Sequence, residues 1–185
     1  KNIENLSFYD VCAAPGGKTF QLLDNGFKVV SNDINKKRIQ ILLENLERLN
    51  FKTKICCNDA LKLNFKKKFN VIIIDAPCTS TGTIRKNPDI LIHKSLNNIK
   101  KTSYLQNKLL SKASTQLEEN GYIMYIVCSL EKKEGEDIIN AFLKKNKNFC
   151  LIPITEDDCS LLNKHQITKE GYIRLLPNLI KVSKI

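Results

Sequence analysis

Three acidic residues stand at the ends of apolar runs, where β-strands are expected to finish. They are Asp33, Asp59 and Asp75, and Asp75 follows the unbroken apolar run 71–74. A short β-branched run bounded by proline is typical of a strand buried on both faces of a parallel sheet. Because the carboxyl ends of parallel strands meet at one edge of the sheet, we expect the three carboxylates to line one crevice.

Two cysteines are expected at the same edge. Cys78 follows the strand that ends at Asp75, and Cys128 follows the apolar run 122–127. If these strands are neighbours, about 4.8 Å apart, both sulfurs enter one pocket. A single free cysteine is more often a buried filler, but two at crevice-facing strand ends indicate covalent catalysis by a thiolate. Methylation of carbon 5 of a pyrimidine needs such a thiolate, because that carbon becomes nucleophilic only after sulfur adds to carbon 6.

A glycine-containing turn follows the first expected strand, and its sequence indicates which class of ligand could bind there. Gly17 and Lys18 resemble the end of a phosphate-binding loop, but Cys12 stands where that motif needs glycine. The GxGxxG dinucleotide pattern is also missing. S-adenosylmethionine therefore fits better than a ligand led by phosphates. Asp33 lies about 20 residues past the turn, in position to accept hydrogen bonds from ribose hydroxyls.

The other two acids suit the remaining parts of such a ligand. Asp59 is placed to accept from an adenine amino group, and Asp75 from a donor near the reacting centre. One aspartate at a strand end is usually a helix cap. Three in register with a glycine turn are better explained by a nucleoside ligand.

Composition limits the class of protein and its partners. The 185 residues carry a formal charge of +11, with 30 Lys plus Arg against 19 Asp plus Glu, which favours nucleic acid as partner. Seven cysteines without a CxxC pair and two histidines provide no zinc-type ligand set. The apolar settings of the cysteines indicate reduced thiols and an intracellular protein, in the nucleus, nucleolus or cytoplasm. No apolar run is long enough to span a membrane.

Strands and helices are expected to alternate along the chain. Strands are predicted at 6–12, 27–32, 53–57, 71–74 and 122–127. Helices are predicted at 19–25, 35–50 and 131–145, with a long helical region after residue 89 that ends at Asn120-Gly121. Three further strands are predicted at 149–154, 172–176 and 179–185, the last two as a hairpin. This alternation predicts an α/β fold with a doubly wound, mostly parallel sheet and an antiparallel edge, in a single domain over 1–185.

The order of these blocks resembles the Sun-domain RNA cytosine-5 methyltransferases, which act on ribosomal and transfer RNA. The matching blocks are DVCAAPGGKT at 10–19, ND at 32–33, NDA at 58–60, DAPC at 75–78, VCS at 127–129 and RLLP at 174–177. The resemblance implies a Rossmann-like class I methyltransferase fold. That fold has a mostly parallel seven-stranded sheet with an antiparallel edge hairpin at the C-terminus.

The resemblance also implies roles for individual residues. Cys128 would be the nucleophile, Cys78 would assist breakdown of the covalent adduct, and Asp75 would also touch the target base. Related DNA enzymes use the Pro-Cys thiol as nucleophile, so the chemistry of the residues alone leaves the two thiols unranked. The residues that would hold S-adenosylmethionine are Cys12, Ala13, Ala14, Pro15, Gly16, Gly17, Lys18, Asp33, Arg38, Asp59 and Asp75.

RNA is the partner that the resemblance implies, and we expect a monomer. Family members usually carry an RNA-binding segment upstream of the first strand, and we expect this chain to lack it. The family's acidic cluster after Cys128 is diluted here to EKKEGE at 131–136. Two alternatives remain: a cofactor-binding scaffold that assists ribosome assembly without catalysis, and a DNA cytosine-5 methyltransferase. Retention of both thiols and all three acids favours an enzyme, and the absence of a large target-recognition insertion disfavours DNA as substrate.

Overall fold

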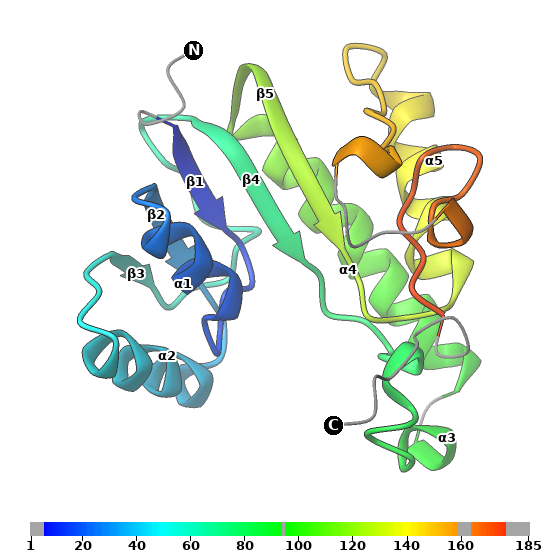
Figure 1. Cartoon of the computed structure of the whole chain (residues 1–185), viewed down its shortest axis with the longest axis horizontal. Helices are drawn as coiled ribbons and strands as arrows, with labels where there is room; N and C mark the ends of the chain where they lie inside the picture. The colour runs from blue at the N-terminus through cyan, green and yellow to red at the C-terminus, as the bar shows by residue number, and fades with distance from the viewer. Residues whose placement is uncertain (1–5, 94, 159–163, 177–185) are drawn as a thin grey trace. The chain divides into compact units, whose positions relative to one another are not determined.

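Five parallel strands organise the residues that the computed structural model describes, which are 6–93, 95–158 and 164–176 (Figure 1). The strands are β1 (Ser7–Asp10), β2 (Lys28–Asn32), β3 (Lys54–Cys56), β4 (Phe69–Asp75) and β5 (Leu117–Ile126). They lie in the order β3-β2-β1-β4-β5. Each neighbouring pair is parallel, so every strand of the sheet ends at the same edge.

The helices follow the predicted alternation. They are α1 (Gly17–Asp24), α2 (Lys36–Arg48), α3 (Ile90–His93), α4 (Leu96–Thr115) and α5 (Glu136–Lys145), with short 3₁₀ turns at η2 (Thr81–Thr83), η3 (Lys132–Glu134), η4 (Glu156–Asp158) and η5 (Lys164–Gln166). None of these described helices is long and apolar enough to cross a membrane.

Residue contacts divide the chain into two compact units. The first consists of Lys1–Pro77 with Tyr104–Val127, and the second of Cys78–Ser103 with Cys128–Ile185. The sheet, α1 and α2 belong to the first unit. A single domain over 1–185 stays a prediction.

Helices of the first unit pack on both faces of the sheet at its centre, β1 and β4. On one face, Phe8, Val29 and Ile73 pack with Leu22 and Leu23 of α1. On the other face, Tyr9 of β1 lines a small cavity with residues from the C-terminal half of α4. This double cover explains the unbroken apolar sequence of β4, because a strand buried on both sides has no polar face.

Helix α2 begins with a side-chain cap. The Asn35 side chain accepts hydrogen bonds from the backbone N–H groups of Lys37 at 2.9 Å and Arg38 at 3.2 Å. Such a cap satisfies donors that have no partner within the first helical turn. The buried stripe of the helix is Ile39, Leu42 and Leu46, which fixes its apolar face against the turn after β1.

The end of α4 is a correction to the predicted elements. The helix ends at Thr115 rather than at Asn120-Gly121, and Leu117 is already the first residue of β5. Leu117 pairs with Phe69, and the register then shifts before Tyr122 pairs with Val71. Asn120, with a φ of 58°, lies in this irregular stretch. The Asn120-Gly121 pair therefore lies inside β5, at an irregularity of the strand, and does not end a helix.

The seven-stranded sheet with an antiparallel edge hairpin is also wrong for the described residues, whose sheet has five parallel strands. The predicted strand 149–154 is irregular, and 172–176 contributes only an isolated antiparallel bridge between Ile167 and Ile173. Pro153 lacks a backbone donor, which disfavours a regular ladder there. The predicted strand 179–185 lies outside the described residues.

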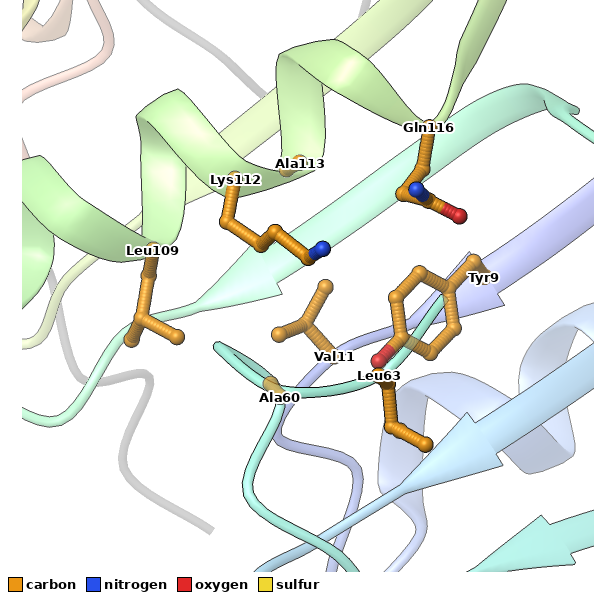
Figure 2. A pocket seen from close by; sticks show the side chains of 8 residues that line it. All are labelled: Tyr9, Val11, Ala60, Leu63, Leu109, Lys112, Ala113 and Gln116. Carbon is orange, nitrogen blue, oxygen red and sulfur yellow. The ribbon is translucent and has the colours of Figure 1, made fainter. Parts of the chain in front are cut away.

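Tyr9 occupies a closely packed aromatic cluster beside the cavity. Its ring lies 5.0 Å from the ring of Phe65 and 5.1 Å from that of Phe69, measured between centroids. Figure 2 shows its hydroxyl among the side chains that line the cavity, which are Tyr9, Val11, Ala60, Leu63, Leu109, Lys112, Ala113 and Gln116. The cavity volume is ≈ 10 Å³, which is about the smallest space that holds one water molecule. No described residue is a hydrogen-bond partner of the buried Tyr9 hydroxyl.

We expect Tyr9→Phe to change the free energy of unfolding by less than about 1 kcal/mol, because the hydroxyl forms no hydrogen bond with a described residue. Tyr9→Ala should cost about 3–5 kcal/mol through loss of the ring. Urea unfolding at equilibrium measures both values. A cost for Tyr9→Phe close to that of Tyr9→Ala would show that the hydroxyl has a strong partner.

Candidate active site

The turn between β1 and α1 is fixed by the buried carboxylate of Asp33. The Ala14 N–H donates to Asp33 Oδ2 at 3.3 Å, and the Arg38 guanidinium pairs with the same oxygen at 3.3 Å. Arg38 also donates to the Ala14 carbonyl, and the Asn35 N–H donates to Asp33 Oδ1 at 2.9 Å. Both oxygens of Asp33 therefore bind protein groups, which places this residue, together with Arg38, in the frame of the turn.

Gly16 is required at the start of α1. Its φ is 115°, and an added Cβ would lie 2.2 Å from Phe20 Cζ, so a side chain there would both strain the backbone and collide with the helix. On either side of Gly16 the turn exposes Pro15 and Gly17, whereas Ala13 and Ala14 are buried. The turn thus presents backbone, with little side chain, at the carboxyl edge of the sheet.

Cys12 begins this turn and is held as a neutral thiol. Burial, followed by the nearby charge of Asp33, raises the pKa of Cys12 to about 12. A thiol with such a pKa carries almost no thiolate near neutral pH. Cys12 is therefore suited to packing in the turn and not to nucleophilic attack.

A buried polar network beneath the turn was missed by sequence reasoning. The Thr19 hydroxyl lies 2.8 Å from Asp10 Oδ2, to which it donates, and 2.8 Å from the Ser31 hydroxyl oxygen. Asp10 is 1% exposed. Desolvation raises its pKa to about 6, although the hydrogen bond from Thr19 opposes this. Asp10 ends an apolar run just as the three predicted acids do, and this position was the signal available in the sequence.

Asp75, the last residue of β4, forms an ion pair across the carboxyl edge of the sheet. Lys18 Nζ lies 2.6 Å from Asp75 Oδ2, and their side chains are 35% and 39% exposed. The structure therefore brings together the lysine of the turn and the acid of β4, which are distant in sequence. Both groups remain partly open to solvent.

Asp59 follows β3 and is positioned through a different contact. The side chain of Asn32 donates to the Asn58 carbonyl at 3.0 Å and accepts from the Asn58 N–H at 3.2 Å. Asp59 Oδ1 accepts from the Leu61 N–H at 3.0 Å. Asn32 thus joins the end of β2 to the segment carrying Asp59, a role that the sequence did not reveal. Among the described residues, Asp59 makes no hydrogen bond or ion pair with the other two predicted acids.

The two cysteines form a close pair within the second unit. Cys78 Sγ and Cys128 Sγ are 3.4 Å apart, and Cys128 is the more exposed. Ser80 completes this cluster: its hydroxyl oxygen lies 3.2 Å from Cys128 Sγ and 3.8 Å from Cys78 Sγ. The hydrogen bond with Cys128, followed by burial, raises the pKa of Cys78 above its usual value. A raised pKa favours the protonated form of Cys78.

The segments that carry the two thiols are tied together by their backbones. The Gly82 N–H donates to the Cys128 carbonyl at 2.9 Å, and the Leu130 N–H donates to the Thr81 hydroxyl at 2.9 Å. A Cβ on Gly82 would lie 2.8 Å from the Cys128 carbonyl oxygen, so this approach requires glycine. The Thr81 hydroxyl also lies 3.2 Å from that of Ser129.

A family profile described as 16S rRNA methyltransferase RsmB/F matches residues 1–182. The chain belongs to the RsmB/F family. S-adenosylmethionine is the cofactor of this family. Ribosomal RNA small subunit methyltransferase B of Shewanella oneidensis is 33% identical over 169 residues, which cover 89% of this chain and 40% of that protein.

Solved structures place the chain in the same group. NSun6 from Pyrococcus horikoshii, crystallised with SFG, is 32% identical with a TM-score of 0.71, covering 77% of this chain and 38% of that one. A methyltransferase homolog from Pyrococcus horikoshii is 32% identical with a TM-score of 0.68, covering 82% and 48%. The fold is thus the Rossmann-like methyltransferase fold of the RsmB/F family, and the chain spans less than half the length of these relatives.

The buried carboxyl of Asp10 predicts a specific pH dependence. Its pKa is raised on folding, from 3.8 to about 6, so its contribution to stability is present below pH 3.8 and is lost as the pH rises through 6. Asp10→Asn should therefore be more destabilising at pH 4.5 than at pH 7.5, by about 2 kcal/mol. Urea unfolding of both proteins at the two pH values measures this difference. An equal cost at both pH values would contradict it.

Proposed function

We propose that the protein containing this chain methylates carbon 5 of a cytosine in ribosomal or transfer RNA through a covalent adduct on Cys128. S-adenosylmethionine is the methyl donor. The observation that carries the proposal is the pair of thiols, Cys78 and Cys128, whose sulfurs are 3.4 Å apart. Membership of a family of rRNA methyltransferases supports RNA as the substrate, and the formal charge of +11 is favourable for binding a polyanion.

The residues around the turn fit S-adenosylmethionine. The turn exposes backbone at Gly17, next to the N-terminus of α1, where a carboxylate is electrostatically favoured. Asp59 Oδ2 has no hydrogen-bond donor among the described residues, so it remains available to an amino group of the ligand. When bound, the cofactor supplies an electrophilic methyl group on a sulfonium. We assign the binding to Cys12–Lys18 (sequence CAAPGGK), Asp33, Arg38, Asp59 and Asp75.

The two thiols have different roles in the proposed reaction, one as the nucleophile and the other as a hydrogen-bond donor. Cys128, the more exposed of the two, serves as the nucleophile, and Cys78 stays protonated because its hydrogen bond with Cys128 raises its pKa. The Cys128 thiolate adds to carbon 6 of cytosine, which makes carbon 5 nucleophilic enough to take the methyl group. The bond from that group to the sulfonium breaks, and its electron pair leaves a neutral thioether. Solvent removes the carbon 5 proton, and the carbon–sulfur bond breaks to return the thiolate. The S–H of Cys78 stabilises this departing sulfur by donating a hydrogen bond to it.

Asp75, besides its place at the cofactor, is the group that we assign to the target base, and its ion pair with Lys18 holds its side chain. Their ion pair keeps both charges at the carboxyl end of β4, three residues before Cys78 in sequence. A carboxylate accepts from the exocyclic amino group of cytosine, whereas a base lacking that group cannot donate to it. Asp75 therefore supports the choice of cytosine as the substrate base.

A 5-fluorocytosine RNA tests the covalent step, because fluorine on carbon 5 cannot leave as a proton and the adduct accumulates. With S-adenosylmethionine present, we expect a denaturation-resistant protein–RNA band in the wild-type protein and none in Cys128→Ala. Cys78→Ser should still form the band, because Cys78 acts only after the adduct exists. The measurement is gel electrophoresis under denaturing conditions.

Two outcomes of this experiment would contradict the assignment. A band lost in Cys78→Ser but kept in Cys128→Ala would make Cys78 the nucleophile, as in the DNA enzymes. No band with any RNA, in a protein that binds the cofactor, would favour the scaffold instead.

The assignment of Asp59 predicts an effect on cofactor affinity alone. Asp59→Asn keeps an oxygen for the Leu61 N–H but replaces the other by an amino group, which repels the adenine amino group. We expect the affinity for S-adenosylmethionine to fall by about tenfold, or about 1.4 kcal/mol, measured by calorimetry. Asp24→Asn, at the exposed end of α1, is the matched control and should bind normally. Equal affinity in both variants would remove Asp59 from the cofactor site.

A further inference from the structure

Glu134 is a fully buried carboxylate in the second unit to which the proposed reaction assigns no role. It lies in the 3₁₀ turn η3, and its exposed fraction is 0%. The Thr79 N–H donates to its carboxylate oxygens at 3.0 and 3.2 Å. The hydroxyls of Thr79 and Thr102 also donate to it, and Ser129 contributes a further hydrogen bond. A buried charge bound by so many donors indicates a built arrangement.

The partners of Glu134 are the immediate neighbours of the two thiols. Thr79 follows Cys78 and Ser129 follows Cys128 in sequence, and their hydroxyl oxygens are 3.3 Å apart. We propose that Glu134 is a positioning residue that holds these two segments together, so that the sulfurs of Cys78 and Cys128 stay within hydrogen-bond distance. This inference rests on the function proposed above and adds a residue to it.

The chemistry of the site requires a carboxylate at this position. Every group that faces Glu134 from Thr79, Thr102 and Ser129 is a donor, and an ionised carboxylate only accepts. Burial opposes the charge, but the hydrogen bonds from Ser129, Thr102 and Thr79 outweigh it and lower the pKa of Glu134 below its usual value. A glutamine would place an amino group against one of these donors. The Thr79 N–H and the hydroxyls would then lose an acceptor inside the protein.

Thr102 gives the arrangement a third anchor. It belongs to the N-terminal part of α4, and its hydroxyl oxygen lies 2.9 Å from the Asn98 carbonyl oxygen of the preceding turn. The neighbouring Ser103 hydroxyl donates to the Lys133 carbonyl at 2.8 Å. Glu134 is therefore held against a helix while it binds the two thiol segments. A group fixed in this way sets the positions of its partners instead of following them.

Loss of the Glu134 carboxylate should change the relative alkylation rates of Cys78 and Cys128. In the full protein without RNA, mass spectrometry of iodoacetamide-treated samples at pH 7.5 gives the alkylation rate of each cysteine. We expect Glu134→Gln to lower the ratio of the Cys128 rate to the Cys78 rate by about tenfold, because Cys78 loses its bond to Cys128 and ionises more readily. Glu131→Gln is the matched control. That acid lies on the same segment, and its side chain makes no hydrogen bond or ion pair with a described residue.

Steady-state kinetics give a second readout. Glu134→Gln should lower kcat for methyl transfer by at least about tenfold while the KM values for RNA and S-adenosylmethionine stay within about twofold. Thr79→Val, which keeps the charge of Glu134 and loses only one hydroxyl donor, should shift the alkylation ratio in the same direction. Thr79→Ser keeps the hydroxyl and should restore the wild-type ratio.

The outcomes separate this inference from simple stabilisation and from the proposed function. An unchanged alkylation ratio and kcat in Glu134→Gln, with only a lower Tm, would overturn the positioning role. If Glu134→Gln fails to fold, an unchanged ratio in Thr79→Val would overturn it as well. Because alkylation needs no RNA, a failure of the proposed methylation would leave the ratio intact and would be recognised as a separate result.

Discussion

The parallel pairing of β4 with β1 on one side and β5 on the other is the constraint on which the candidate site depends. It brings Asp10, Asp75 and Ile126 to the carboxyl edge of neighbouring strands, with Asp75 directly opposite Ile126. The segments bearing Cys78 and Cys128 therefore leave the sheet from paired positions. An antiparallel β5 would start at the carboxyl edge of the other strands instead of ending there. The segment bearing Cys128 would then leave the sheet from the opposite edge.

Buried charge at this edge is tolerated because each group binds donors. Asp33 accepts backbone N–H groups and pairs with Arg38, whereas Asp10 has a hydrogen bond from Thr19 and one oxygen without a partner among the described residues. Because Asp10 has only one hydrogen bond to offset burial, desolvation raises its pKa. Asp33, whose two oxygens both have partners, fixes the turn. Asp10, with one oxygen unpartnered among the described residues, makes the stability of the fold depend on pH.

Periodicity and strand-end residues were enough to predict the first two-thirds of the fold. The sequence predicts the positions of three acids at the carboxyl ends of β2, β3 and β4, namely Asp33, Asp59 and Asp75. The β-branched runs indicate buried strands, and parallel pairing brings the ends of these strands to one edge of the sheet. Prediction failed where local signals compete with tertiary contacts. Asn120-Gly121 has the composition of a helix stop, yet Leu117 already pairs with Phe69.

The least predictable residues are those that act through folded contacts. Ser80 adopts a left-handed conformation, with a φ of 60°, that a sequence would assign to glycine or asparagine. This conformation carries its hydroxyl to the two sulfurs. Glu134 stands in a charged stretch that reads as a solvated surface, yet it is fully buried. No sequence spacing predicts the contacts of Ser80 or of Glu134, because both residues bind partners about 50 positions away in the chain.

The asymmetry between the thiols follows from their surroundings instead of from their sequence motifs. Both cysteines follow a strand, and both precede a hydroxyl residue, so their local sequences are alike. Cys128 is exposed and lies beside the Ser80 hydroxyl, which can turn to donate to a thiolate. Cys78 is less exposed and its pKa is raised by its bond to Cys128. Two thiols 3.4 Å apart do not both ionise easily, because two like charges at this separation repel each other. The better solvated thiol is then favoured as the thiolate. The surroundings of the two thiols therefore favour Cys128 as the nucleophile of the proposed reaction.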